Sequence, residues 1–343
     1  MRILVDLLHP AHVHVFRNLI MVMRERGDDV LITTRDKDVT IALLTEYDLD
    51  HTVISSQSTG TAGMAGEWAL RSTKLAKIAR SFRPDVMTGI MGVSIAPVGK
   101  LLRIHSAVYY DTEFATTTNR VVYPLATVVV TPDCYSAPVS GNHIRYPSYH
   151  ELAYLHPDRF QPDPSIVSAV GIDTASPYSV VRFVSWEASH DRGELALTGN
   201  QKRALVERLS KHGRVLISSE MALPDDLEPF SYRGPVGAIH HVMTYASLVV
   251  GESATMASES AVLGTPSVYI AKTSRGYIDD LEQRYGLVRH FEPNAFDRAV
   301  GAADSFMGDE AQQAAADARK QLLLDKVDLT AWMLDFFEQY RDS

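Results

Sequence analysis

The sequence lacks several features that would place it in a special class of protein. One cysteine, Cys134, occurs in 343 residues, so the chain can form no internal disulfide and has no CxxC redox or zinc motif. Basic residues are not in excess: the formal net charge is −9, without the basic footprint of a nucleic-acid-binding protein. No apolar run approaches the roughly 20 residues of a membrane span, and the first residues read as a strand and not as a signal peptide. We therefore expect a cytoplasmic protein.

What remains is an ordinary globular composition. Hydrophobic residues make up 45% of the chain and charged residues 22%. At about 100–200 residues per domain, the length favours two domains. These properties suit a two-domain enzyme but name no reaction.

Short β-branched runs alternate with longer segments of helical period in both halves of the chain. Strands are expected at residues 3–6, 30–34, 51–55, 84–88, 107–110, 128–130, 179–184, 215–218, 248–251 and 267–270. Helices are expected at residues 15–26, 39–46, 67–82, 198–211, 239–246, 256–263, 295–306, 310–326 and 329–340. This alternation predicts α/β domains with doubly wound parallel sheets.

A proline-rich stretch interrupts the rhythm and suggests the domain boundary. Six prolines lie between residues 134 and 177, and the alternation restarts after them. We expect a first domain at 1–150, a linker at 151–177, a second domain at 178–327, and a last helix at 328–343 that returns to the first domain. Ligands of open parallel sheets bind outside the carboxyl ends of strands, so two such domains imply a cleft between them.

The strand at 248–251 runs into a turn of small residues. Gly251 and the residues after it let the backbone approach a ligand, and Ser253 or Thr255 can cap the following helix, whose free N–H groups attract phosphate. Glu259 lies one turn inside that helix, where it can bind a ribose diol. An ordinary capped turn with a surface glutamate explains the same residues. The turn has neither the GxGxxG spacing of a dinucleotide site nor a Walker loop.

This turn resembles the nucleotide-sugar loop of GT-B glycosyltransferases. The pattern Ser-Ala-Thr-Met-x-x-Glu followed by Leu-Gly-Thr-Pro is similar to the transferase that forms lipid II and to the non-hydrolysing UDP-N-acetylglucosamine 2-epimerases. In those families the turn holds a diphosphate and the helix glutamate binds the ribose. The resemblance therefore assigns the diphosphate to Ser253, Ala254 and Thr255, and the ribose to Glu259, with Met256 as a further nucleotide-sugar-binding candidate.

A closer resemblance is to domain of unknown function 354, a GT-B-like family. It is carried by four segments of both halves: His9–Phe16, residues 149–155, residues 182–191 and the turn at 251–266. It implies a GT-B fold, with two Rossmann-like domains facing a cleft. In proteins of this fold the loop before the helix at 239–246 contacts the nucleobase, which here would be Gly237, near His240 and His241.

Three histidines follow the first strand. A histidine at a helix N-terminus tends to be neutral and can act as a base on a sugar hydroxyl. In the lipid II transferase a histidine followed by Val-Phe faces the acceptor, which the resemblance transfers to His14. His9 and His12 would then lie on the acceptor side. Binding of a metal by the three histidines, or a structural cap with a packed ring, are the alternatives.

Further polar residues follow other strands. Asp111 and Glu113 follow the strand at 107–110 and can bind an acceptor, transfer a proton or only hold their loop. Arg182 lies in an apolar strand and needs a partner, either a diphosphate or a carboxylate such as Glu220. The remaining candidates after these strands are Ser185, Ser219 and Glu220, which could bind the nucleotide sugar, and His190, which is preferred to the serines as a catalytic group.

These residues support three functions. The first is a glycosyltransferase with a nucleotide-sugar donor, which the resemblance implies is UDP-linked, and an unknown acceptor. The second is an isomerase of the 2-epimerase type, in which Asp111, Glu113 and His190 supply acid–base groups. The third is a nucleotide-sugar-binding protein without catalysis. The resemblance implies no metal and no cofactor besides the substrate.

Basic residues on the predicted helix at 67–82 form a stripe. Arg71, Lys74, Lys77, Arg80 and Arg83 are spaced by three and four residues. Such a stripe is more often a solvated face than a contact with an anionic membrane surface, and we favour the first interpretation.

Overall fold

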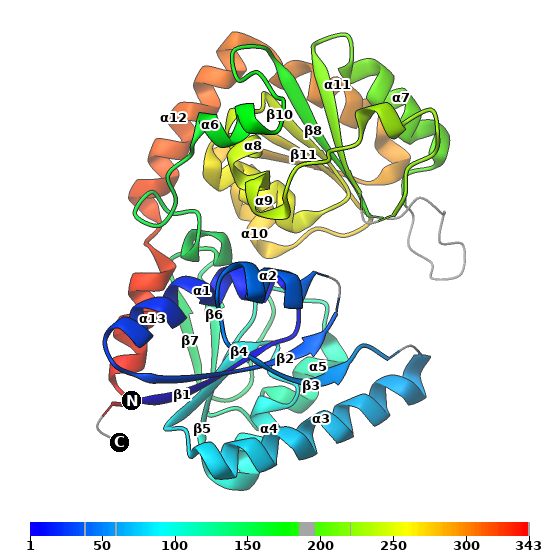
Figure 1. The fold of residues 1–343 in the computed structure, drawn as a ribbon. Helices are drawn as coiled ribbons and strands as arrows, with labels where there is room; N and C mark the ends of the chain where they lie inside the picture. Colours follow the sequence, from blue (N-terminus) through cyan, green and yellow to red (C-terminus); the bar gives the residue numbers. More distant parts are fainter. Residues whose placement is uncertain (38, 59, 185–195, 220, 342–343) are drawn as a thin grey trace. The chain divides into compact units, whose positions relative to one another are not determined.

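The computed structural model describes residues 1–37, 39–58, 60–184, 196–219 and 221–341. The chain divides into two compact units: Met1–Arg159 with Lys326–Ser343, and Phe160–Asp325 (Figure 1). The expected linker is shared between them, because Glu151–Leu155 are buried in the first unit and α6 (Pro164–Ala169) belongs to the second. No helix in these described ranges is both long and apolar enough to cross a membrane.

The first unit contains a seven-stranded parallel sheet of order β3-β2-β1-β4-β5-β6-β7. Its strands are β1 (Arg2–Leu7), β2 (Asp29–Asp36), β3 (Thr52–Ser56), β4 (Val86–Ile90), β5 (His105–Tyr109), β6 (Val128–Pro132) and β7 (His143–Tyr146). Its helices are α1 (Pro10–Glu25), α2 (Thr40–Glu46), α3 (Gly60–Phe82), α4 (Ile95–Leu102), α5 (Thr116–Val122) and α13 (Leu329–Glu338).

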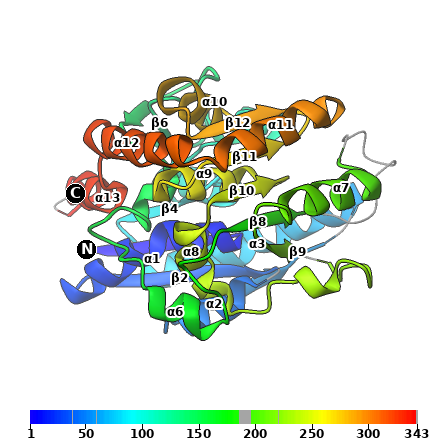
Figure 2. The same ribbon diagram turned by 90° about the horizontal axis from the view of Figure 1, so that it is seen from above.

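Helices cover both faces of this sheet (Figures 1 and 2). Leu75 and Ala79 of α3 and Ile95 of α4 pack on strand residues such as Leu4 and Met87. On the other face, α1 buries a stripe at the helical period and also contacts α2 and α13. Burial of these apolar faces, at about 25 cal/mol per Å², is the main force that holds helices on the sheet.

The second unit contains a five-stranded parallel sheet of order β12-β11-β10-β8-β9. Its strands are β8 (Tyr178–Phe183), β9 (Arg214–Ser219), β10 (Leu248–Gly251), β11 (Ser267–Ile270) and β12 (Val288–Phe291). Its helices besides α6 are α7 (Gly199–Leu209), α8 (Ile239–Tyr245), α9 (Ala254–Leu263), α10 (Gly276–Asp280), α11 (Phe296–Phe306) and α12 (Asp309–Asp325). Helices α7 and α11 form a core with one face of the sheet, and α9 packs on the other side against α8 and α12 (Figure 2).

The predicted α/β class is confirmed by these two parallel sheets. One detail of the sequence interpretation is wrong: Arg71 does not belong to a solvated basic stripe. Its guanidinium is buried and forms an ion pair with Asp6 of β1, while it also donates to the Ser55 hydroxyl at 2.9 Å. A helix period cannot show this, because the partner lies in another element.

Candidate functional site

The turn between β10 and α9 requires a close approach of two strands. Gly251 pairs with Arg182 of β8, and a Cβ atom on Gly251 would lie 2.1 Å from the Arg182 carbonyl oxygen. Only glycine permits this approach. The strand order reverses between β8 and β10, so the turn lies at the topological switch point, where open α/β sheets bind their ligands.

The N-terminus of α9 follows this turn directly. The Ser253 hydroxyl accepts a hydrogen bond from the Met256 N–H at 3.3 Å and caps the helix. The first helical hydrogen bond joins Ala257 N–H to Ser253 O, so the N–H groups of Ala254 and Thr255 precede it. All residues from 252 to 256 are partly exposed. The structure therefore brings together the predicted diphosphate residues at a capped, accessible helix N-terminus, which attracts anions.

Glu259 lies one turn inside α9, and its carboxylate is not on the surface. It is 5% exposed and receives a hydrogen bond on Oε1 from Nε2 of His240 in α8 at 2.9 Å. The sequence suggested that His240 lies near the nucleobase loop. In the structure its ring contacts the Glu259 carboxylate directly. His241 points elsewhere, since its Nδ1 accepts the Asp163 N–H at 3.0 Å.

The predicted nucleobase loop is compact. Gly237 is the middle residue of a three-residue 3₁₀ helix, Val236–Ala238, which leads into α8. It is half-buried, and the preceding Pro235 carbonyl accepts a hydrogen bond from the Tyr232 hydroxyl at 3.0 Å.

Arg182 of β8 contacts the neighbouring strand β9; Glu220, the carboxylate expected as one alternative partner, is not among the residues that the structure describes. Its Nη1 donates to the Ser218 hydroxyl at 3.0 Å, at the carboxyl end of β9. The Ser219 hydroxyl accepts a hydrogen bond from the Met221 N–H at 3.2 Å. Three predicted residues, Ser185, His190 and Glu220, lie outside the described residues.

A buried ion pair beside this turn was missed by the sequence interpretation. Nζ of Lys202, from the first turn of α7, lies 3.1 Å from Oε2 of Glu252 and is fully buried. Glu252 also accepts the N–H groups of Leu197 at 3.0 Å and Val184 at 3.3 Å. The position of Glu252 directly after the strand glycine was the available signal. The Glu252 carboxylate, directly after β10, thus contacts both the residue that follows β8 and Lys202 of α7.

The three predicted histidines, His9, His12 and His14, take different positions around the start of α1. His9 caps the helix through Nδ1, which accepts the Ala11 N–H at 3.2 Å. His14 is buried, with its ring stacked on Tyr154 at 5.2 Å and its Nδ1 3.4 Å from the Tyr47 hydroxyl.

His12 is held neutral at the carboxyl edge of the first sheet. Burial, with the nearby His9, holds the pKa of His12 well below its usual value. Its Nδ1 accepts the Leu8 N–H at 3.2 Å, so the single proton of the neutral ring is on Nε2. His12 is therefore a hydrogen-bond donor at Nε2.

Asp111 follows β5 at the same edge and forms a pair that the sequence did not suggest. Its Oδ2 accepts a hydrogen bond from Nδ1 of the buried His150 at 2.9 Å. Burial opposes both charges, but the pair outweighs it: the pKa of Asp111 falls to about 2, and the pKa of His150 is raised. The Glu113 carboxylate accepts a hydrogen bond from the Ser136 N–H at 3.4 Å.

Strand β4 packs closely on β1 and ends in a turn with unusual backbone angles. A Cβ on Gly89 would lie 2.6 Å from the Asp6 carbonyl oxygen, so this strand packs tightly on β1. Immediately after β4, Met91 and Gly92 both have positive φ, 64° and 56°. A non-glycine residue in this conformation is strained, and such strain often marks functional turns.

The comparisons with known proteins include a family model that covers the first half of the chain. Residues 1–171 match the family model described as "Protein of unknown function (DUF354)". Over these residues the chain belongs to the DUF354 family. The chain is also 25% identical over 280 residues to Uncharacterized protein MJ0665 of Methanocaldococcus jannaschii, a match that covers 77% of this chain and 80% of that protein.

Solved structures resemble this DUF354 chain along nearly its whole length. UDP-GlcNAc 2-epimerase from Methanocaldococcus jannaschii has a TM-score of 0.62 at 13% identity, over 94% of this chain and 99% of that one. The spinosyn rhamnosyltransferase SpnG, complexed with thymidine diphosphate, has a TM-score of 0.67 at 14% identity, over 98% and 100%. The resemblance in fold confirms the predicted GT-B fold class.

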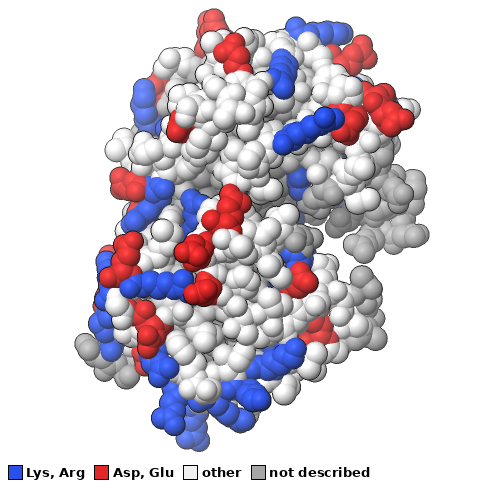
Figure 3. All heavy atoms as spheres, in the orientation of Figure 1, with Lys and Arg blue, Asp and Glu red and all other residues white. Residues whose placement is uncertain are grey.

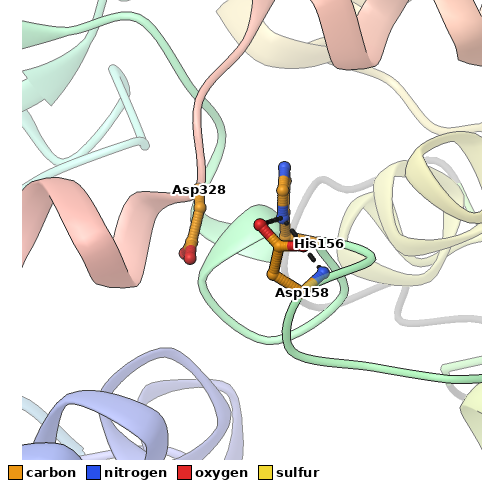
Figure 4. Close-up of side chains that lie close together, drawn as sticks. All are labelled: His156, Asp158 and Asp328. Atoms are coloured by element: carbon orange, nitrogen blue, oxygen red, sulfur yellow. Dashed lines mark hydrogen bonds and ion pairs between the residues drawn. The ribbon is translucent and has the colours of Figure 1, made fainter.

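One group of possible metal ligands occurs among the described residues of this DUF354 chain. His156, Asp158 and Asp328 place one ligand atom each within 4.8 Å of one another (Figure 4). Asp328, however, is the N-cap of α13 and lies 2.7 Å from Nε of Arg159. His156 Nδ1 already accepts the Asp158 N–H at 3.3 Å. These contacts assign the group a structural role at the start of α13.

A cavity of about 610 Å³ lies in the second unit but not at the candidate site. It is lined by Ile172, Arg214, Leu216, Tyr232 and Pro235, along the outer edge of β9. Because Arg214 begins β9, the cavity extends to the amino end of that strand. The candidate site rests on the switch-point turn and not on this cavity.

Proposed function

We propose that this DUF354 protein is a glycosyltransferase that uses a nucleotide-sugar donor. The observation that carries the proposal is the turn at Gly251: a glycine that the neighbouring strand makes necessary, followed by the Ser253-capped N-terminus of α9, at a topological switch point. Such a turn binds a diphosphate without needing a positive overall charge, which suits a chain of net charge −9.

In this proposal the second unit binds the donor. The diphosphate contacts the N–H groups of Ala254 and Thr255, and Arg182 neutralises its charge as it leaves. Glu259 binds the ribose, with His240 holding its carboxylate in one orientation. The donor nucleotide is uridine diphosphate in our proposal; the solved relatives are a UDP-GlcNAc 2-epimerase and a rhamnosyltransferase with thymidine diphosphate.

The first unit binds the acceptor hydroxyl. Asp111 accepts a hydrogen bond from this hydroxyl, and the neutral His12 donates one from Nε2 to the acceptor. We assign the contact with the acceptor hydroxyl to Asp111 in preference to His14, because the His14 ring is stacked on Tyr154 and packs edge-on against Tyr47. The acceptor oxygen forms a bond to C1 of the sugar, the bond from C1 to the diphosphate breaks, and the hydroxyl proton passes by way of the Asp111 carboxylate to solvent. We further propose that the protein acts in the cytoplasm and that transfer needs no metal.

An isomerase of the 2-epimerase type is the second candidate. The observation that favours it is the cluster of His12, Asp111 and His150, which combines a neutral imidazole with a carboxylate–imidazole pair. Acid–base chemistry on a sugar needs two such groups with different pKa values.

One experiment separates these functions. The full chain is incubated with UDP-sugars, with and without a panel of sugar and lipid-linked alcohols, and products are followed by mass spectrometry and NMR. UDP released only in the presence of an acceptor, with a glycosylated product, supports transfer. An epimerised sugar that is still attached to its nucleotide would contradict the transferase proposal and support the isomerase. Binding of UDP without any product across the panel points to a binding protein.

A further inference from the structure

The segment from α3 to β5 has a charge opposite to that of the rest of the chain. Residues 60–110 contain seven lysines and arginines but only two acids, Glu67 and Asp85. Both acids already accept hydrogen bonds. Glu67, in the N-terminal third of α3, accepts the Ser58 N–H, and Asp85 accepts the Arg2 N–H. A chain of net charge −9 thus has a strongly basic region in its first unit.

Apart from the buried Arg71, the basic residues of this region are exposed. Within the described ranges their side chains form no ion pair or hydrogen bond; they are Lys74, Lys77, Arg80, Arg83, Lys100 and Arg103. Figure 3 shows Lys and Arg side chains gathered at the lower end of the first unit, where Figure 1 places the C-terminal end of α3 and helix α4. We call these six residues the basic face. Six like charges without counter-ions repel one another and favour an anionic partner.

An apolar side chain stands within the basic face. Leu101, next to Lys100 at the end of α4, is 70% exposed. Beside it lies a cavity of about 530 Å³ at the amino ends of β5 and β6, lined among others by Lys100, Arg103 and His105. A leucine between cations, next to a basic cavity, is suited to a surface that is anionic outside and apolar beneath.

We propose that the basic face docks the protein on an anionic lipid surface. Lysine and arginine side chains contact lipid phosphates, Leu101 inserts among the acyl chains, and the cavity beside Lys100 accepts one headgroup phosphate. A nucleic acid also offers phosphates but gives an exposed leucine nothing apolar to enter, so the lipid is favoured. The face lies at the amino ends of β4 and β5, and Asp111 follows the carboxyl end of β5, so docking leaves that edge of the first sheet free.

The test is sedimentation of the full chain with vesicles. Vesicles of phosphatidylcholine with phosphatidylglycerol should bind the protein, vesicles of phosphatidylcholine alone should not, and salt should release it. Each cation near an anionic surface strengthens binding about fivefold, so Lys100→Glu with Arg103→Glu should weaken binding at least about 25-fold. Leu101→Ser should weaken it about tenfold, by removing one inserted side chain.

The control has the same net charge as the double variant. Lys211→Glu with Arg233→Glu changes two exposed cations of the second unit and should bind these vesicles like the parent, apart from a small general loss. All variants should keep the melting temperature and the UDP affinity of the parent, since the substituted residues are exposed and none belongs to the switch-point turn. The proposal is overturned if anionic vesicles do not bind, if both double variants lose binding equally, if Leu101→Ser binds fully, or if duplex DNA displaces the vesicles. None of these results depends on whether UDP is a ligand.

Discussion

Nδ1 of His150 donates a hydrogen bond to Oδ2 of Asp111 at 2.9 Å, across 39 residues of sequence. His150 lies in a short 3₁₀ helix, His150–Ala153, after β7, and Asp111 follows β5. The buried imidazole fixes the carboxylate in one orientation, and the carboxylate in turn favours the charged ring. The pair therefore links the position of a candidate acceptor-binding group to the protonation of a group behind it.

This pair should make the stability of the first unit depend on pH. The pKa of Asp111 is lowered from 3.8 to about 2, so its contribution is present above about pH 4 and is lost as the pH falls towards 2. The pKa of His150 is raised above 6.5, so its contribution is present below 6.5 and is lost as the pH rises through the higher folded value. Asp111→Asn should cost about 2 kcal/mol near pH 5, and less on either side.

Calorimetric unfolding of the parent and Asp111→Asn between pH 3 and pH 9 measures this difference. Asp225→Asn, which removes an exposed carboxylate of the second unit, serves as the control and should show a flat difference. A flat profile for Asp111→Asn as well would mean that the pair is not charged in the folded protein.

The strand pattern was readable because parallel, buried strands are continuous apolar runs. The sequence predicted ten strands at positions where the structure has them, but β7 and β12 were missed. Both lie at the edge of their sheet, and His143, Arg145, Arg289 and His290 make them look polar. Edge strands need less apolar surface, so their pattern is weaker.

Gly251→Ala should disrupt the second unit. Its Cβ would lie 2.1 Å from the Arg182 carbonyl oxygen, which belongs to the β8 backbone and cannot move without breaking the ladder. We expect a loss of about 3 kcal/mol in unfolding free energy, and UDP affinity at least about tenfold weaker. Gly301→Ala in α11 is the matched control: nothing lies within 4 Å, and alanine should stabilise the helix by about 1 kcal/mol. Denaturant unfolding and UDP titration of both variants measure these two effects. A stable Gly251→Ala protein with parental UDP affinity would show that the turn is not where the donor binds.

Lys202 and Glu252 should behave as one unit. Both side chains are buried, and removal of either leaves an uncompensated charge, so Lys202→Met and Glu252→Gln should each cost about 3 kcal/mol. The double variant should cost clearly less than the two single costs together. Arg203→Met, one residue away but part of an exposed pair with Asp226, should change stability little. Additive costs in denaturant unfolding would show that the two charges do not stabilise each other.

The site residues were predictable one by one, but their partners were not. The cap at Ser253 depends on local sequence, and the structure has it. His240 and Glu259 are 19 residues apart, and Lys202 and Glu252 are joined only by the packing of α7 on the sheet. These pairs depend on which helix ends meet at the carboxyl edge, and no spacing along the chain encodes that.

Glu259 should discriminate between ribose and deoxyribose if it binds the ribose diol. The parent should prefer UDP to 2′-deoxy-UDP, because a hydrogen bond to a charged carboxylate contributes about 1.5–3 kcal/mol, or roughly tenfold to a hundredfold in affinity. Glu259→Ala should bind UDP more weakly and lose this preference, since 2′-deoxy-UDP has no contact left to lose. Glu259→Gln keeps an acceptor for His240 and should retain the fold while weakening the preference for UDP.

The control is Glu207→Ala, at an exposed position on α7, which should behave like the parent. Calorimetric titration gives all eight affinities. A preference for UDP that survives in Glu259→Ala would place the ribose elsewhere, and the buried Glu259–His240 contact would then be a structural link between α8 and α9.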